Sequence, residues 1–327
     1  MPDVERYLQV FESLRQRKRW DTDVGVLRFA ALTLAATDVV DPGREVEQAA
    51  GVLRELARWS SPLRSSLRFV IAAMIVRRGL DPKAVHRSIE GVREEFRRRR
   101  MRRGGTHELL AALMLVLHAE GRRPETRSIG RVKENLARWK KDHRFLTGSD
   151  DYPLAALHAT RELSVEELGI RVERIYQQLR KARYSRGNQL QLASHLLAIG
   201  ERSAAGCAQR FDSIARALGE RKVRPTTSRY DEIAILSLTA LGPAAVARAV
   251  VSLRDRLRAA KPRPSSSLAF SLAAGLFLAE DARRSEGLGH TRDLAAVRSA
   301  QAVIEAQQAA MIAAMSAATV AASAASS

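Results

Sequence analysis

The stretch GGTHELLAALMLVLHA, residues 104–119, begins with a polar cluster and continues as a run that is apolar on nearly every side of a helix. A helix without a polar face is a buried helix. Six further segments have the same form, and together they indicate the fold. The seven buried-helix segments are 20–36, 61–76, 104–119, 148–159, 185–200, 228–242 and 264–279.

The segments between these buried helices are amphipathic. In residues 164–181 an apolar stripe recurs at three- and four-residue spacing, opposite Arg and Glu, as in a half-exposed helix. Several of these segments have Pro or Ser in the first turn, where a helix commonly begins. Clear examples of the amphipathic segments are 42–59, 82–101, 164–181 and 243–261.

The two kinds of helix alternate along the chain. The quartet LARW occurs at 56–59 and again at 136–139, which suggests a repeat of about 40 residues. We therefore predict an all-α fold, a two-layer array of about six to seven antiparallel helical hairpins of roughly 40 residues each. The array is either a curved α-solenoid resembling HEAT or armadillo repeats or a closed α/α toroid.

The ends of the chain differ from the repeat. We predict a capping helix over residues 1–19, the hairpin array over residues 20–281, and a loop with an Ala-rich C-terminal helix or tail over residues 282–327. Paired alanines recur at a regular spacing in this tail. They fit either a frayed chain end or a narrow helix face for close packing.

The composition is strongly basic, with 55 Lys and Arg against 36 Asp and Glu, a net charge of +19. This charge favours a polyanion such as nucleic acid as the binding partner. A general preference for Arg in the sequence is the alternative explanation, because it produces the same excess in proteins that bind nothing acidic. A single Cys, the absence of a signal peptide and the absence of a long apolar run predict a cytoplasmic protein without a transmembrane segment. We expect no cofactor and no metal, because no matching motif is present.

Alignment of the buried helices on their apolar cores places one residue of each in a common column near the helix start. Most of these residues have side chains that accept hydrogen bonds from first-turn amides. For Asp151, which Pro153 follows in the first turn, we expect a place at the helix N-cap or next to it. The column consists of Asp23, Ser65, His107, Asp151, Asn188, Asp231 and Ser266.

The same column is also a candidate binding rim, since equivalent helix ends lie on one face of such an array. The doublets HE, DD and DE supply more polar side chains than capping needs. In a toroidal enzyme these acids would be the acid/base groups or metal ligands. The candidate rim residues are His107, Glu108, Thr147, Asp150, Asp151, Tyr152, Asn188, Asp231 and Glu232.

Two histidines follow their column residues at the same distance. His158 and His195 should therefore lie about two turns down adjacent buried helices, where the two rings could be side by side. They would either line a pocket below the rim acids or lie in the core, each satisfied by a neighbour. The absence of an HExxH motif favours the core position.

The run RRRRMRR, residues 97–103, ends an amphipathic helix before two glycines. Cations suit the C-terminal end of a helix dipole, so a solvated helix end is one interpretation. Contact with a phosphate backbone is the alternative, although no aromatic residue is interleaved for base stacking. The candidate polyanion contacts are Arg97, Arg98, Arg99, Arg100, Arg102 and Arg103.

The segment FLTGSDDYPLAALHA, residues 145–159, resembles the signature of an uncharacterised bacterial family, a domain of unknown function with the pattern F-L-T-x-x-D-D-Y-x-x-A-x-L. The resemblance implies a helical bacterial protein over most of the chain, excluding the Ala-rich tail, and no assigned reaction. It rests on Phe145, Leu146, Thr147, Asp150, Asp151, Tyr152, Ala155 and Leu157.

Three functions remain open from the sequence. A helical-repeat scaffold that holds a protein or peptide partner on the rim is favoured, because repeats without a catalytic motif are usually binding platforms. A nucleic-acid-binding repeat that uses the arginines of the amphipathic helices is the alternative. A toroidal enzyme with carboxylates on the rim is the third hypothesis. The sequence does not fix the oligomeric state.

Overall fold

The computed structural model describes residues 4–17, 22–142 and 147–286. Within these ranges the chain forms fourteen α-helices and three short 3₁₀ helices, with no strand. The chain divides into two compact units, and over the described residues the boundary falls between Glu125 and Thr126. We call the described residues up to Glu125 the first unit and those from Thr126 onward the second unit. The all-helical prediction is therefore confirmed.

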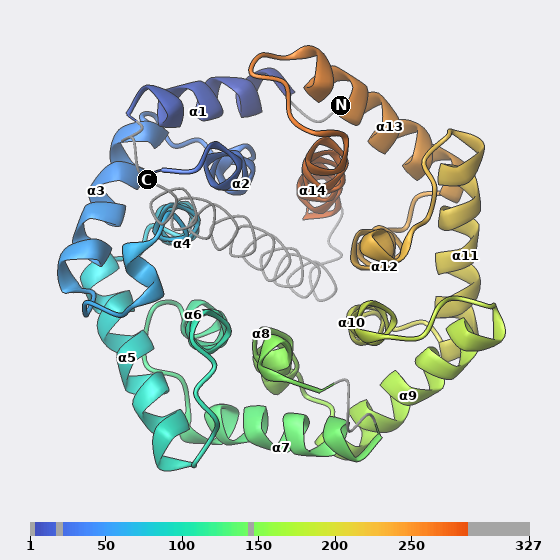
Figure 1. Cartoon of the computed structure of the whole chain (residues 1–327), viewed down its shortest axis with the longest axis horizontal. Coiled ribbons are helices and arrows are strands. Elements are labelled where there is room, and N and C mark those ends of the chain that lie inside the picture. Colours follow the sequence, from blue (N-terminus) through green and yellow to red (C-terminus); the bar gives the residue numbers. More distant parts are fainter. Residues whose placement is uncertain (1–3, 18–21, 143–146, 287–327) are drawn as a thin grey trace, which may run out of the picture. The chain divides into compact units, whose positions relative to one another are not determined.

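The first unit alternates amphipathic and apolar helices (Figure 1). The amphipathic helices α1, α3 and α5 contact one another in succession, and each also contacts the apolar helix that follows it. The apolar helices α2 and α4 contact each other as well. The elements are α1 Val4–Gln16, α2 Val24–Leu34, α3 Pro42–Leu56, η1 Pro62–Arg64, α4 Arg68–Arg77, α5 Pro82–Arg98 and α6 Thr106–His118.

The second unit continues the alternation, with amphipathic α7, α9, α11 and α13 in contact from one to the next. The apolar helices α10, α12 and α14 also contact in succession (Figure 1). The elements are α7 Thr126–Asp142, η2 Ser149–Asp151, α8 Tyr152–Ala159, α9 Val165–Lys181, α10 Asn188–Leu197, α11 Ala204–Glu220, η3 Thr227–Arg229, α12 Tyr230–Leu236, α13 Pro243–Ala259 and α14 Ser266–Glu286.

Burial follows the two sequence patterns. In α6 every residue from Glu108 to Leu117 is buried, whereas α5 buries only a stripe that ends at Phe96. Each fully buried leucine stabilises the fold by about 1.5–3 kcal/mol. A change such as Leu113→Asp would remove that contribution and bury an unpaired charge, so it should break the apolar layer of the first unit.

Side-chain caps start the amphipathic helices. Asp41 caps α3 and Asp81 caps α5, each before a proline in the first turn. Ser164 forms a capping box with Glu167 at the start of α9. These starts agree with the Pro and Ser signals in the sequence, because an accepting side chain satisfies first-turn amides and proline has no amide to satisfy.

The capping column holds for part of its residues: Ser65 accepts from the Leu67 amide just before α4, at 3.3 Å. Asp23 accepts from the amides of Gly25 and Val26 at the start of α2. Asp151 directly precedes α8, but its carboxylate accepts from the Gly148 amide and caps no amide of α8. The reason is the 3₁₀ turn before α8, since a chain that enters a helix already coiled has no extended cap residue.

Two further boundaries differ from the sequence prediction. α3 ends at Leu56, before the end of the predicted segment 42–59. α14 continues to Glu286, past the end of the predicted buried-helix segment 264–279. The Ala-rich helix expected in the tail lies outside the described residues, and the limits 1–19, 20–281 and 282–327 stay predictions. None of the helices in the described ranges combines the length and apolarity that a membrane span needs.

Arginines join one hairpin to the next in the second unit. An arginine on each of the amphipathic helices α7, α9 and α11 donates to backbone carbonyls at the end of an apolar helix or in the loop after it. Such carbonyls are unsatisfied within their own helix and lie at the negative end of its dipole. These clamps are Arg131 with the carbonyls of Arg161 and Leu163, Arg171 with those of Ala198, Gly200 and Arg202, and Arg210 with those of Thr239 and Leu241.

Candidate functional site

The predicted rim acid Glu108 is a buried structural group. Its Oε1 accepts from Arg93 Nε at 3.0 Å, and its Oε2 accepts from the Gly104 amide at 3.1 Å. Arg93 also donates to Glu90 at 2.7 Å. These bonds fix the turn between α5 and α6, because both oxygens of the carboxylate are used on this chain's own donors.

The corresponding residues of the second unit are divided between core and surface. Glu232 is buried on α12 and accepts from the hydroxyl of Ser271 on α14. Asp231 beside it is half-buried, and Asn188 is exposed at the first residue of α10. His107, in the first unit, is half-buried in the first turn of α6. In the described part of the chain, no three His, Cys, Asp or Glu side chains are grouped as metal ligands.

The doublet of Asp150 and Asp151 is split between solvent and core. Asp150 is exposed, whereas Asp151 is 9% exposed and accepts from the Gly148 amide at 2.8 Å. Burial raises the pKa of Asp151 to about 7. A carboxyl with this pKa is able to exchange a proton near neutrality. The side chain of the next residue, the predicted rim residue Tyr152, is buried in the core.

His158 and His195 lie side by side in the core of the second unit. Their ring centroids are 5.6 Å apart, and the His158 Nε2 is 3.1 Å from the carbonyl oxygen of His195. Trp139 of α7 lies against both rings, with its centroid 3.8 Å from that of His195. Burial lowers the pKa of His158 to about 3, which keeps this ring neutral. This packing fits the core alternative for the two histidines.

One further polar contact joins the rim segment to this core. Gln191 of α10 donates to the hydroxyl of Thr147 at 3.4 Å. Phe145 and Leu146, the first residues of the resemblance to the uncharacterised family, lie outside the described residues. The buried rim acids Glu108, Asp151 and Glu232 thus accept hydrogen bonds from donors of this chain.

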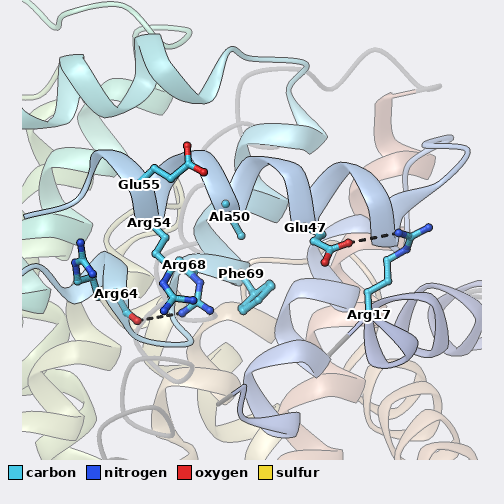
Figure 2. A pocket seen from close by; sticks show the side chains of 9 residues that line it. Arg17, Glu47, Ala50, Arg54, Glu55, Arg64, Arg68 and Phe69 are labelled. Atoms are coloured by element: carbon cyan, nitrogen blue, oxygen red, sulfur yellow. Dashed lines mark hydrogen bonds and ion pairs between the residues drawn. The ribbon is translucent and has the colours of Figure 1, made fainter. Parts of the chain in front are cut away.

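The first unit contains a cavity of about 420 Å³ between α1, α3, η1 and α4 (Figure 2). Four arginines and two glutamates line it, above a floor of small and apolar groups. A volume of this size is within the range of small-ligand sites. The lining residues are Arg17, Glu47, Ala50, Gly51, Arg54, Glu55, Arg64, Arg68 and Phe69.

Arg68 is the deepest charge of this cavity, because it is only 3% exposed. Its Nη1 donates to the carbonyls of Arg64 and Ser65 at 3.0 and 2.9 Å, and its guanidinium lies 4.7 Å from the ring centre of Phe69. Figure 2 shows Arg54 and Arg68 converging on one side of the cavity. These bonds hold the buried guanidinium in one orientation.

The charge of the cavity is positive after internal pairing. Arg17 pairs with Glu47 at 3.4 Å, and the other charged lining residues are Arg54, Arg64, Arg68 and Glu55. Figure 2 shows the carboxylate of Glu55 directed away from those arginines. Within the described ranges, neither Arg54 nor Arg64 has a carboxylate at ion-pair distance. The cavity therefore suits an anion.

A second cavity of about 250 Å³ is lined in part by the connecting segment between α3 and η1. It includes Arg97 and Arg103 from the predicted polyanion cluster, together with Arg58, which sequence reasoning missed. In the described residues these three arginines have no carboxylate partner. The lining residues are Arg58, Ser60, Ser61, Glu90, Arg93, Arg97, Arg103, Gly105 and Glu108.

The other arginines of the predicted cluster have different surroundings. Arg98 pairs with Glu94 at 2.8 Å and Arg99 pairs with Glu95 at 2.9 Å, each within α5. Arg100 has φ of 56° and ends α5 with a left-handed residue, as in a Schellman motif. Arg102 is exposed. The cluster is thus partly a helix end and partly the lining of a cavity.

An exposed tryptophan lies in the connection between α3 and η1, which lines the second cavity, while Arg54 and Arg64 on either side of it line the first. Trp59 is 89% exposed, whereas Trp139, in the identical quartet LARW, is 2% exposed. The first quartet follows the end of α3 and precedes Ser60, Ser61 and Pro62, while the second lies inside α7. The signal missed in the sequence is therefore the helix break after the first quartet, which turns its Trp and Arg toward solvent.

A family model described as "Protein of unknown function (DUF4003)" matches residues 10–309 of the chain. This agrees with the resemblance to a domain of unknown function, while the signature pattern itself stays a prediction. The comparison with curated proteins gave no match. The comparison with solved structures gave no match either.

Proposed function

The chain belongs to this family of unknown function, and we propose that it binds single-stranded nucleic acid through residues 54–64 of the first unit. The observation that carries the proposal is the exposed Trp59 between the arginines of two cavities. Proteins that bind single strands combine a positive groove for the backbone with aromatic rings on which bases stack. Residues 54–64 supply both groups within one short segment.

The charge pattern supports a backbone contact. Arg54, Arg58 and Arg64 come from this segment, and Arg97 and Arg103 come from the end of α5 and the loop after it. An arginine without a carboxylate partner is available to bind a phosphate in a bidentate geometry. Release of the counterions then makes the affinity depend on salt.

The test measures binding of a fluorescein-labelled deoxythymidine 12-mer by anisotropy over a range of salt concentrations. The double variant Arg54→Ala/Arg58→Ala should bind more weakly. Its log–log salt slope should be less steep by about 1.4, because each of the two phosphates that the variant no longer neutralises contributes about 0.7. Trp59→Ala should cost about 1–3 kcal/mol of binding free energy at every salt concentration, with little change in slope.

A control with the same charge change is available in the second unit. Arg221 and Arg224 are exposed and have no ion pair among the described residues. Arg221→Ala/Arg224→Ala lowers the net charge equally, so it separates a local site from general basicity. If both double variants lose affinity equally, the proposed site is wrong.

A protein or peptide partner remains the second candidate. The observation in its favour is that Leu56, 43% exposed, lies close to Trp59 in the same exposed segment. Apolar and aromatic side chains together are typical of protein interfaces. Binding of a fluorescein-labelled acidic peptide that weakens in Trp59→Ala, together with no binding of the 12-mer, would favour this candidate over nucleic acid.

We further propose that the hairpins form one curved array, either an open solenoid or a closed toroid. The alternation of helix contacts inside each unit supports this arrangement. Small-angle X-ray scattering distinguishes the two forms. A compact closed chain of 327 residues should have a radius of gyration of about 20 Å, and an open solenoid a larger one.

A further inference from the structure

We infer that Ser60 is a phosphorylation site, and that a phosphate on Ser60 pairs with arginines of the second cavity and blocks the binding of a nucleic-acid strand. This inference rests on the proposed function and names its regulation. The second cavity, of about 250 Å³, is lined by Ser60 and Ser61 together with Arg58, Arg97 and Arg103. It brings two hydroxyls and these three guanidiniums to one place in the first unit.

The three arginines come from different segments and are not neutralised by the fold. Arg58 lies in the connection between α3 and η1, Arg97 in the last turn of α5, and Arg103 in the loop before α6. A further arginine of the lining, Arg93, pairs with both glutamates of the cavity. Within the described ranges no carboxylate lies at ion-pair distance from the other three. Such a cluster can bind a phosphorylated side chain through charge-assisted hydrogen bonds.

Ser60 is the serine of the cavity that an enzyme can reach. It is exposed, as Trp59 before it is, and its side chain makes no hydrogen bond to the described part of the chain. Ser61 is half-buried, and its hydroxyl accepts from the Leu63 amide at 3.3 Å at the start of η1. An exposed side chain on a connection is accessible to an enzyme without unfolding of the flanking helices.

The size of the cavity favours a phosphate that is attached to the chain over a free ligand. A volume of about 250 Å³ is below the range of about 300–1,000 Å³ that is usual for small-molecule sites. The connection that carries Ser60 is short, and the Ser61 amide donates to the Arg58 carbonyl within it at 2.9 Å. An attached phosphate therefore stays beside these arginines and avoids the loss of translational freedom that capture of a free ligand costs.

The modification is a phosphoryl transfer from a nucleoside triphosphate, catalysed by a protein kinase. The hydroxyl oxygen of Ser60 forms a bond to the γ-phosphorus, the bond from that phosphorus to the bridging oxygen breaks, and a nucleoside diphosphate leaves. The hydroxyl proton passes to a base of the kinase. The new group carries a charge of about −1.5 to −2 near neutral pH and three acceptor oxygens, which can bind more than one guanidinium.

This phosphate would compete with a bound strand for the same arginines. The proposed function uses Arg58, Arg97 and Arg103 for the nucleic-acid backbone, and a phosphate on Ser60 would occupy them. It would also place negative charge next to Trp59, where it repels the phosphates of a strand whose base stacks on the ring. Phosphorylation should therefore switch binding off.

The experiment compares the unmodified protein with two forms that carry phosphoserine, incorporated during synthesis, at residue 60 or at residue 185. Ser185 is the matched control, because it is exposed between the exposed Arg183 and Arg186 but lines neither cavity of the first unit. Phosphoserine at 60 should weaken binding of the labelled 12-mer about tenfold or more, the effect of at least one lost charge-assisted hydrogen bond. Phosphoserine at 185 should weaken it less than about threefold, through net charge alone.

A second measurement reports the pairing of phosphate and arginine without any strand. The midpoint of the phosphorus-31 chemical-shift titration lies near about pH 6 for a free phosphoserine. For phosphoserine at 60 it should be lower by about one pH unit, because nearby cations favour the doubly charged phosphate. Arg97→Ala/Arg103→Ala should return it toward the free value. Circular dichroism confirms that the modified proteins and the variant are folded.

Mass spectrometry of the protein from its native cells tests whether the site is used. Trypsin releases residues 59–64 as the peptide WSSPLR, and fragmentation of this peptide separates a phosphate on Ser60 from one on Ser61. We expect a phosphate on Ser60 in part of the protein. Its absence both during growth and during starvation would overturn the inference.

Other results would overturn the inference in distinguishable ways. An unshifted phosphorus-31 midpoint would reject the pairing with the arginines. A shifted midpoint with unchanged binding of the 12-mer would reject the regulation and leave the proposed function in place. Equal losses of affinity with phosphoserine at 60 and at 185 would reduce the effect to net charge. Failure of the 12-mer to bind the unmodified protein would reject the proposed function itself, while the titration still decides the pairing.

Discussion

Replacement of Asp151 by Asn should stabilise the protein at alkaline pH and change its stability little at acidic pH. Burial raises the pKa of Asp151 from 3.8 to about 7, against the lowering effect of the hydrogen bond from Gly148. The folded state therefore binds this proton more tightly than the unfolded chain. The stabilisation that the proton provides is complete below about pH 4 and is lost as the pH rises through about 7.

The size of the effect follows from the two pKa values. A difference of about three between folded and unfolded pKa corresponds to about 4 kcal/mol, at about 1.36 kcal/mol for each pKa unit. This is an upper limit, because water penetration and relaxation weaken burial effects. The Asp151 carboxylate accepts from the Gly148 amide at 2.8 Å. Asn also has an oxygen that can accept this hydrogen bond, and its side chain carries no charge at any pH.

The assay is urea unfolding of wild type and Asp151→Asn at about pH 4 and about pH 8. Burial also lowers the pKa of His158 to about 3, so that group destabilises the fold as the pH falls below about 6.5. This contribution is common to both proteins and cancels in their difference. Asp150→Asn, at the exposed neighbour, is the control, and its effect should be much smaller, because the charge of Asp150 is the smallest contribution to the raised pKa of Asp151. An equal difference at the two pH values would refute the reasoning.

Three further predictions concern the fold. Arg171→Ala should cost about 2 kcal/mol of unfolding free energy through loss of its bonds to three carbonyls, and the exposed Arg174→Ala should cost less than about 0.5 kcal/mol. Trp139→Ala should cost about 3–5 kcal/mol by chemical denaturation and Trp59→Ala close to nothing, so similar losses would contradict the assigned burial. Glu108→Ala should cost about 1–3 kcal/mol by thermal or urea unfolding, since it removes the acceptor of the Gly104 amide and one of the two carboxylates that pair with Arg93, and a neutral result would show that this ion pair is not structural.

The helices could be predicted from sequence because the two burial patterns are distinct. α6 is apolar on all sides, which predicts a fully buried helix, and α9 has a single apolar stripe, which predicts a half-exposed helix. The ends of the helices were less predictable. α8 and α12 follow 3₁₀ turns, which leave the column residues Asp151 and Asp231 without the extended conformation of a cap.

The candidate site was harder to predict, because it depends on what lies around each residue. The quartet LARW reads the same at 56–59 and 136–139, and only the residues after it decide whether the helix continues. Arg97 was identified from its cluster, but the cavity that it lines also needs Arg58, which is distant in the sequence. The pairing of His158 with His195 was predictable because the two residues occupy equivalent positions on neighbouring helices.

The arginine clamps change how the charge of +19 is interpreted. Arg131, Arg171 and Arg210 bind backbone carbonyls, which satisfy the guanidinium but do not neutralise it. Part of the excess charge is therefore a consequence of how the hairpins are joined, and it would attract any polyanion weakly. A specific nucleic-acid site must then be identified by its local effects. For this reason the salt slope of the Arg54/Arg58 variant, compared with the Arg221/Arg224 control, decides the function better than the affinity of the wild-type protein.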